Sequence, residues 1–114
     1  MAFEATVTLT GDTTSYQINP NIKKFALKDV GFQETKVGNF VLKRSLDPNS
    51  PYNATVELKV MVNKDLTGFK LATLTGNEMR DVNIFKMAKK DDFLEQFHYI
   101  MGTLAEREII NPVD

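Results

Sequence analysis

The sequence predicts an α+β domain, in which a mostly antiparallel β-sheet packs against one long C-terminal helix. Two segments carry this prediction. Across residues 92–109, apolar residues recur at the i, i+3, i+4, i+7 spacing that gathers them on one side of a helix. Across residues 54–63, apolar and polar residues alternate, which is typical of a strand that buries one face. The apolar side of the helix is expected to hold Phe93, Phe97, Ile100, Met101, Leu104 and Ile109.

The N-terminal part of the chain is expected to form one or two strands and a short helix. Residues 3–10 alternate between apolar and polar side chains, and residues 15–18 are expected to return as a short partner strand. Asn19 followed by Pro20 predicts a helix N-terminus, and Gly31 predicts the end of the same helix. The buried face of this helix is expected to hold Ile22, Phe25 and Ala26.

A run of antiparallel strands follows the short helix. Gly38-Asn39 and Gly76-Asn77 predict tight turns, because these residue pairs tolerate the positive φ angles that such turns need. The strongly alternating strand at residues 54–63 is expected in the middle of the sheet. The expected strands lie at residues 32–36, 40–46, 54–63, 69–75 and 79–86.

The long helix has recognisable ends. Asp92 is placed to cap the first turn, with Glu95 three residues later, and Asn111-Pro112 is expected to stop the helix. A chain of 114 residues without repeats or linker-like composition forms one domain, so residues 1–114 are expected to make a single α+β unit.

The composition excludes several classes of protein. There is no cysteine, which rules out disulfides, thiolate metal sites and cysteine nucleophiles. The formal net charge of −1 gives no electrostatic footprint for nucleic acid. No apolar run approaches the roughly 20 residues that span a bilayer, and residues 1–4 lack the basic start of a secretory signal. We therefore expect a cytoplasmic protein that binds neither nucleic acid nor membranes.

Motifs for catalysis or cofactor binding are missing from the sequence. His98 is the only histidine, and it is predicted to pack its ring at the edge of the apolar side of the helix. Nucleotide-binding glycine patterns, the G-x-S-x-G elbow and metal-ligand spacings are also absent. We expect no metal and no cofactor. An enzyme is the third alternative, and it requires His98 or Asp47 to lie in a cleft beside another polar group.

The best candidate for a binding site is the polar loop after the strand at residues 40–46. Its guanidinium, carboxylate, amide and phenol groups could converge on a small polar ligand, with Arg44 forking onto a carboxylate or phosphate. The competing interpretation, a loop whose side chains satisfy their own backbone, is favoured on composition. The candidate ligand-binding residues are Arg44, Asp47, Asn49, Tyr52 and Asn53.

Four segments resemble those of a small family of unknown function from Gram-positive bacteria. They read GDTT at residues 11–14, KDVGFQET at 28–35, SLDPNSPYNA at 45–54 and NKDLTGFK at 63–70. The resemblance implies an α+β fold distantly like the TATA-binding-protein-like and S-adenosylmethionine-decarboxylase-like folds, and a loose link to amino-acid metabolism. Relatives that carry a cysteine-desulfurase label imply no such activity here, because that chemistry needs a cysteine. The family supplies no catalytic residue that could be transferred to this chain.

Two functional hypotheses follow from these observations. The first is a non-enzymatic protein, connected with amino-acid metabolism, that binds a small polar metabolite. The alternative is a protein-interaction module that regulates a metabolic enzyme through an exposed sheet face or edge strand. Either protein is expected to be a monomer or a homodimer.

Overall fold

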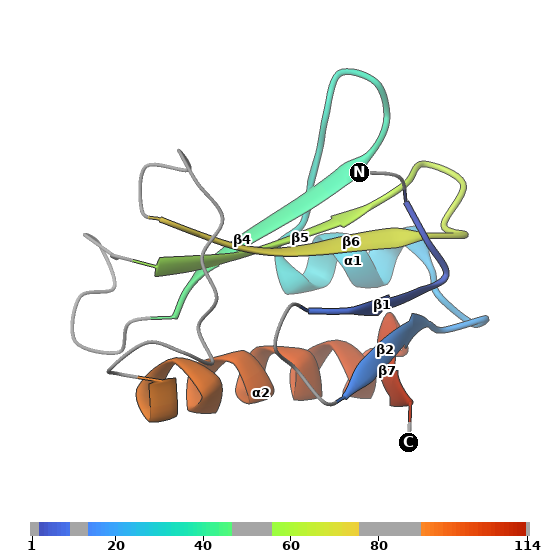
Figure 1. The fold of residues 1–114 in the computed structure, drawn as a ribbon. Coiled ribbons are helices and arrows are strands. Elements are labelled where there is room, and N and C mark those ends of the chain that lie inside the picture. The colour runs from blue at the N-terminus through green and yellow to red at the C-terminus, as the bar shows by residue number, and fades with distance from the viewer. Residues whose placement is uncertain (1–2, 10–13, 47–55, 76–89, 114) are drawn as a thin grey trace.

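The computed structural model describes residues 3–9, 14–46, 56–75 and 90–113. Two antiparallel sheets and two helices make up this part of the chain, which confirms the predicted α+β class (Figure 1). In chain order the elements are β1 (Thr6–Thr8), β2 (Ser15–Ile18), α1 (Lys24–Val30), β3 (Gln33–Glu34), β4 (Phe40–Ser45), β5 (Val56–Val62), β6 (Phe69–Thr75), α2 (Lys90–Glu106) and β7 (Ile110–Val113).

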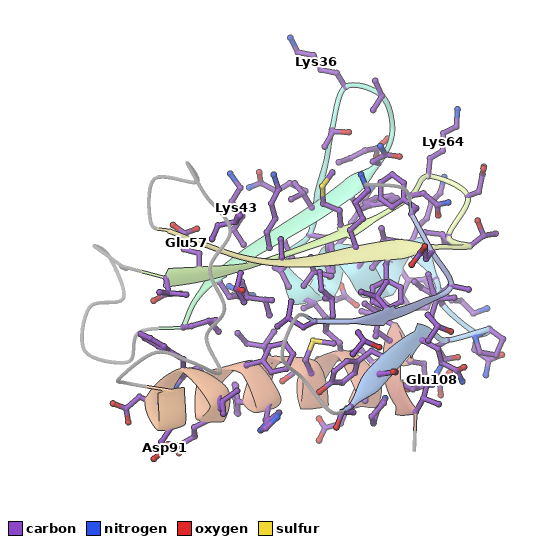
Figure 2. The ribbon with its side chains drawn as sticks, in the orientation of Figure 1. Lys36, Lys43, Glu57, Lys64, Asp91 and Glu108 are labelled. Atoms are coloured by element: carbon purple, nitrogen blue, oxygen red, sulfur yellow. The ribbon has the colours of Figure 1, made fainter. Side chains whose placement is uncertain are left out.

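The larger sheet has four strands in the order β3-β4-β5-β6, so β5 lies in its interior as predicted. The register places Val60 of β5 opposite Leu42 of β4 and Leu71 of β6. Most side chains on this inner face are buried, with Arg44 an exposed exception, whereas Lys43 and Glu57 point away from the helices on the outer face (Figure 2). A register shift of one residue would expose the whole row of apolar side chains to water. The free energy lost in that exposure determines the pairing of the strands. The buried inner-face residues are Phe40, Leu42, Val56, Leu58, Val60, Val62, Phe69, Leu71 and Thr73.

Helix α2 runs beneath the inner face of this sheet (Figure 1). The side chains of Phe97 and Leu104 are fully buried, and Met101 is 2% exposed, so the predicted apolar side faces the core. The ring of Phe97 meets Tyr16 of β2 edge to face, with ring centroids 5.8 Å apart. This geometry adds roughly 1 kcal/mol to the burial of the two rings.

The smaller sheet has the order β1-β2-β7 and was only partly predicted. The helix expected over residues 92–109 ends at Glu106, and the chain then forms β7, which pairs with β2. The prediction failed at this end because Ile109 continues the apolar spacing of the helix, although it lies after a left-handed residue, Glu108 (φ 58°). At the other end α2 begins at Lys90, so Asp92 lies inside the first turn instead of capping it.

The short helix α1 also differs from its prediction. Asn19 accepts a hydrogen bond from the backbone N–H of Asn21 (2.7 Å), but the chain makes only a turn there, and α1 begins four residues after Pro20. Because of this later start, Phe25 is 65% exposed and Leu27 is buried in its place. The end of α1 is as predicted, since Gly31 adopts a left-handed conformation.

Two expectations lie outside the described residues. They are the strand at residues 79–86 and the part of the polar loop from residue 47 to residue 53. The strand predicted over residues 3–10 is shorter in the structure: β1 spans three residues, and Glu4 forms an isolated bridge to Phe69 of β6. This bridge joins the two sheets.

Candidate functional site

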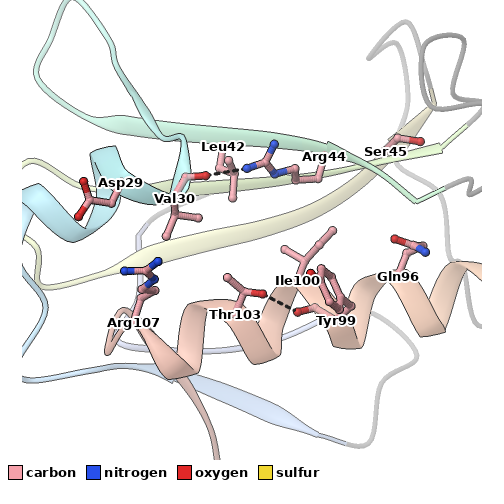
Figure 3. A pocket seen from close by; sticks show the side chains of 10 residues that line it. All are labelled: Asp29, Val30, Leu42, Arg44, Ser45, Gln96, Tyr99, Ile100, Thr103 and Arg107. Carbon is pink, nitrogen blue, oxygen red and sulfur yellow. Dashed lines mark hydrogen bonds between the residues drawn. The ribbon is translucent and has the colours of Figure 1, made fainter.

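A cavity of about 350 Å³ lies between the end of α1, strand β4 and helix α2 (Figure 3). Its lining residues on α2 recur every three or four positions, so they share one side of the helix next to the core-facing stripe. The cavity is lined by Asp29, Val30, Leu42, Arg44, Ser45, Gln96, Tyr99, Ile100, Thr103 and Arg107.

The cavity has an apolar floor and polar walls. Leu42 and Ile100 are buried and Val30 is half-buried, so they form a dry base where the helices approach the sheet. Small-molecule sites commonly combine such a base with a few polar groups that fix the ligand's orientation. Their volumes are roughly 300–1,000 Å³, and this cavity lies at the lower end of that range.

Arg44 enters the cavity from β4 and is anchored at the end of α1. Its Nη2 atom donates a hydrogen bond to the carbonyl of Val30 at 2.6 Å. The guanidinium passes close to Gly31, where an added Cβ would lie 3.0 Å from Nη2. The bond satisfies a carbonyl at the helix end, which is a structural role for Arg44. A guanidinium carries five N–H donors, so its capacity for hydrogen bonds exceeds this single contact.

Arg107 and Asp29 lie together at one end of the cavity (Figure 3). Arg107 directly follows α2, and Asp29 is the penultimate residue of α1. Both side chains are exposed, and these two described residues form no ion pair with each other. Among the described residues that line it, the cavity has two guanidinium groups and one carboxylate, a formal charge of +1, whereas the whole chain carries −1.

The other end of the cavity carries uncharged polar groups. Ser45 and Gln96 lie there, and Tyr99, 73% exposed, stands between this end and the charged end (Figure 3). The hydroxyl of Thr103 donates to the backbone carbonyl of Tyr99 at 3.1 Å, one turn earlier in α2. Hydrogen-bonding groups therefore extend along the whole length of the cavity.

Comparison with known proteins assigns the chain to a family. The model of the DUF1831 family, described as "Putative amino acid metabolism", matches residues 1–111. The chain belongs to this family. It is also similar to the crystal structure of a DUF1831 family protein from Lactobacillus plantarum, with 46% sequence identity over 99% of both chains and a TM-score of 0.90. No curated protein matches the sequence. These findings confirm the resemblance to an uncharacterised family of Gram-positive bacteria.

Only one of the predicted ligand-binding residues can be placed. Arg44 lines the cavity, whereas Asp47, Asn49, Tyr52 and Asn53 lie outside the described residues, so their convergence on a ligand stays a prediction.

Sequence reasoning missed two charged residues of the cavity, Asp29 and Arg107. Helical spacing could have flagged Arg107, which lies four residues after Thr103 and seven after Ile100. The position of Asp29 depends on how α1 meets β4, and no local pattern reports that.

His98 lies away from this cavity, beside an apolar groove of about 150 Å³. Its side chain is exposed, although its ring lies 5.5 Å from that of the neighbouring Phe97, so it is less packed than predicted. Within the described ranges, no group of three or more histidine and acidic side chains could hold a metal ion. Likewise, none of the described helices is long and apolar enough to cross a membrane.

Proposed function

We propose that this DUF1831 protein binds a small carboxylate-bearing metabolite of amino-acid metabolism, and does so without catalysing a reaction. One observation carries the proposal: Arg44 and Arg107, from different parts of the fold, line one cavity of ligand-binding size. The family description supports the choice of metabolite class.

Guanidinium chemistry supports a carboxylate as the recognised group. Arginine presents a rigid fork of N–H donors that matches the two oxygens of a carboxylate. Arg44 is the better oriented of the two, because the carbonyl of Val30 holds its guanidinium in place. A group that is already ordered loses less entropy on binding, so its hydrogen bonds contribute more to affinity. The apolar floor then receives the hydrocarbon part of the ligand.

The test is isothermal titration calorimetry with the free amino acids and with dicarboxylic acids of two to five carbons. At least one carboxylate should bind, and Arg107→Gln should lower its affinity by about 10- to 150-fold. This corresponds to roughly 1.5–3 kcal/mol for a charge-assisted hydrogen bond. Among the described residues Arg107 has no ion-pair partner, so the variant should keep the melting temperature of the parent.

Lys36→Gln is the matched control. Lys36 lies on the turn between β3 and β4 and points into solvent far from α2 (Figure 2). The Lys36→Gln substitution removes the same charge as Arg107→Gln, and it should leave carboxylate binding unchanged. If no carboxylate binds at millimolar concentration, or if both variants weaken binding equally, the proposal is wrong.

The alternative, an interaction module that regulates a metabolic enzyme, has less support from surface chemistry. The large apolar side chains most exposed in the described part of the chain are Phe25 (65%), Val37 (71%) and Tyr99 (73%). They come from α1, the β3–β4 turn and α2, and isolated apolar residues of this kind are normal on a protein surface. Tyr99 lines the cavity, so a ligand also accounts for its exposure.

A further inference from the structure

We infer that the ligand is an acidic α-amino acid, whose ammonium group binds Asp29 while its two carboxylates bind Arg107 and Arg44. This inference rests on the proposed function and names its ligand class. Three features of the described residues carry it: the position of Asp29, the absence of an ion pair between Asp29 and Arg107, and the net charge of the residues that line the cavity.

Asp29 is out of place in a site for a simple carboxylate. A carboxylate in the wall repels an anionic ligand and lowers the affinity of the site for it. Asp29 also lies in the last turn of α1, where the helix dipole disfavours negative charge. An ammonium group on the ligand would be attracted both by the carboxylate of Asp29 and by the negative end of the helix dipole.

Asp29 and Arg107 present opposite charges without neutralising each other (Figure 3). An α-amino acid carries its ammonium and carboxylate on one carbon, so it can contact both residues at the same end of the cavity. Such an arrangement selects against analogues that lack either group, since one wall charge would then be buried without a partner.

Arg44 accounts for the third charge. It lies further along the cavity than Arg107, beside Val30 and Leu42 and across from Ile100 of α2 (Figure 3). In the proposed pose the ligand's side chain lies along these apolar residues, and its carboxylate binds the guanidinium of Arg44. The formal charge of +1 on the described lining residues then matches the −1 of an amino acid with an acidic side chain.

The experiment compares L-glutamate with glutarate, which differs only in lacking the ammonium group, and with L-glutamine, which lacks the side-chain charge. Isothermal titration calorimetry on the full chain should show L-glutamate or L-aspartate binding at least about tenfold more tightly than glutarate and L-glutamine. Asp29→Asn should lower the affinity for the acidic amino acid by about tenfold or more. The affinity for glutarate should stay unchanged or rise, because the carboxylate that repels it is gone.

Asp65→Asn is the matched control, because it makes the same change at an exposed turn residue that does not line the cavity. It should alter neither affinity. Asp29→Asn should fold with an equal or slightly higher melting temperature, which separates a binding role from a structural one.

Equal affinity of the wild-type protein for glutamate and glutarate would overturn this inference and leave the proposed function standing. So would an Asp29→Asn variant that loses both ligands together. Neutral amino acids that bind as tightly as acidic ones would overturn the assignment of Arg44. Failure of every carboxylate to bind would overturn the proposed function, and this inference with it.

Discussion

Replacing Gly31 with alanine tests how the end of α1 shapes the cavity. Gly31 has φ 119°, and its backbone N–H bonds to the carbonyls of Leu27 and Lys28 at 3.2 Å each. The next N–H, of Phe32, bonds to the carbonyl of Leu27 at 2.9 Å. These bonds define a Schellman end, in which the left-handed position is best filled by glycine. Alanine there carries a backbone cost of roughly 1–2 kcal/mol.

The new methyl group would also meet Arg44. Its carbon would lie 3.0 Å from Nη2 and 3.7 Å from a methyl carbon of Leu42, so the guanidinium must shift by a few tenths of an ångström. This shift weakens the hydrogen bond to the carbonyl of Val30, which costs up to about 1 kcal/mol more. Gly31→Ala should therefore destabilise the protein by about 1–3 kcal/mol, which lowers the melting temperature by roughly 4–12 °C in a domain of this size.

Gly102→Ala is the matched control. Gly102 lies inside α2, and beyond the backbone of the helix itself a Cβ there would meet no atom of the described residues within 4 Å, so the substitution should raise stability by about 0.5–1 kcal/mol. Thermal melts followed by circular dichroism, together with urea titrations, measure both changes. Calorimetry should also show weaker carboxylate binding by Gly31→Ala, because Arg44 has moved. A Gly31→Ala variant as stable as the parent would refute the assigned left-handed end and the contact with Arg44.

The other predictions concern stability and use the same melts. Glu108→Gly should stabilise the protein by roughly 1 kcal/mol, because glycine relieves the left-handed backbone (φ 58°) after α2; a lower melting temperature would contradict this. Leu58→Ala should cost about 2–5 kcal/mol because Leu58 is fully buried in β5. Met61→Ala, on the half-exposed outer face, should cost under about 1 kcal/mol, and equal costs would refute the assignment of faces. Asn63→Ala should cost roughly 1–2 kcal/mol, because its Oδ1 accepts the N–H groups of Thr67 (2.9 Å) and Gly68 (3.1 Å) in the β5–β6 turn; a neutral result would show that this turn holds without it.

The two helix ends explain why one boundary was predictable and the other was not. Both helices finish with the same pattern of hydrogen bonds: Ile109 bonds to Leu104 (2.9 Å) after α2, as Phe32 bonds to Leu27 after α1. After α1 the left-handed residue is glycine, which is a readable signal in the sequence. After α2 it is Glu108, an ordinary helix former, so neither the turn nor strand β7 could be foreseen.

The core was predictable because burial follows periodicity. The alternation along β5 predicted which face of the strand is buried. The spacing of Phe97, Met101 and Leu104 predicted the buried side of α2 in the same way. The cavity was less predictable, since its charges come from positions 29, 44 and 107, which only the tertiary fold brings together. Composition drew attention to the polar loop, and of its candidate residues Arg44 is the one that the described structure places in the cavity.

The helix ends also determine where the charges of the cavity lie. Asp29 and Val30 are the last residues of α1, and Arg107 is the residue between α2 and the left-handed Glu108. Each chain reversal therefore fixes the direction in which a charged side chain leaves its helix, and the reversals after α1 and α2 bring Asp29 and Arg107 to the same end of one cavity. A substitution at Gly31 acts on stability and on the site through the same contact with Arg44. Glu108→Gly, by contrast, keeps the left-handed conformation, so it should raise the melting temperature and leave ligand affinity unchanged.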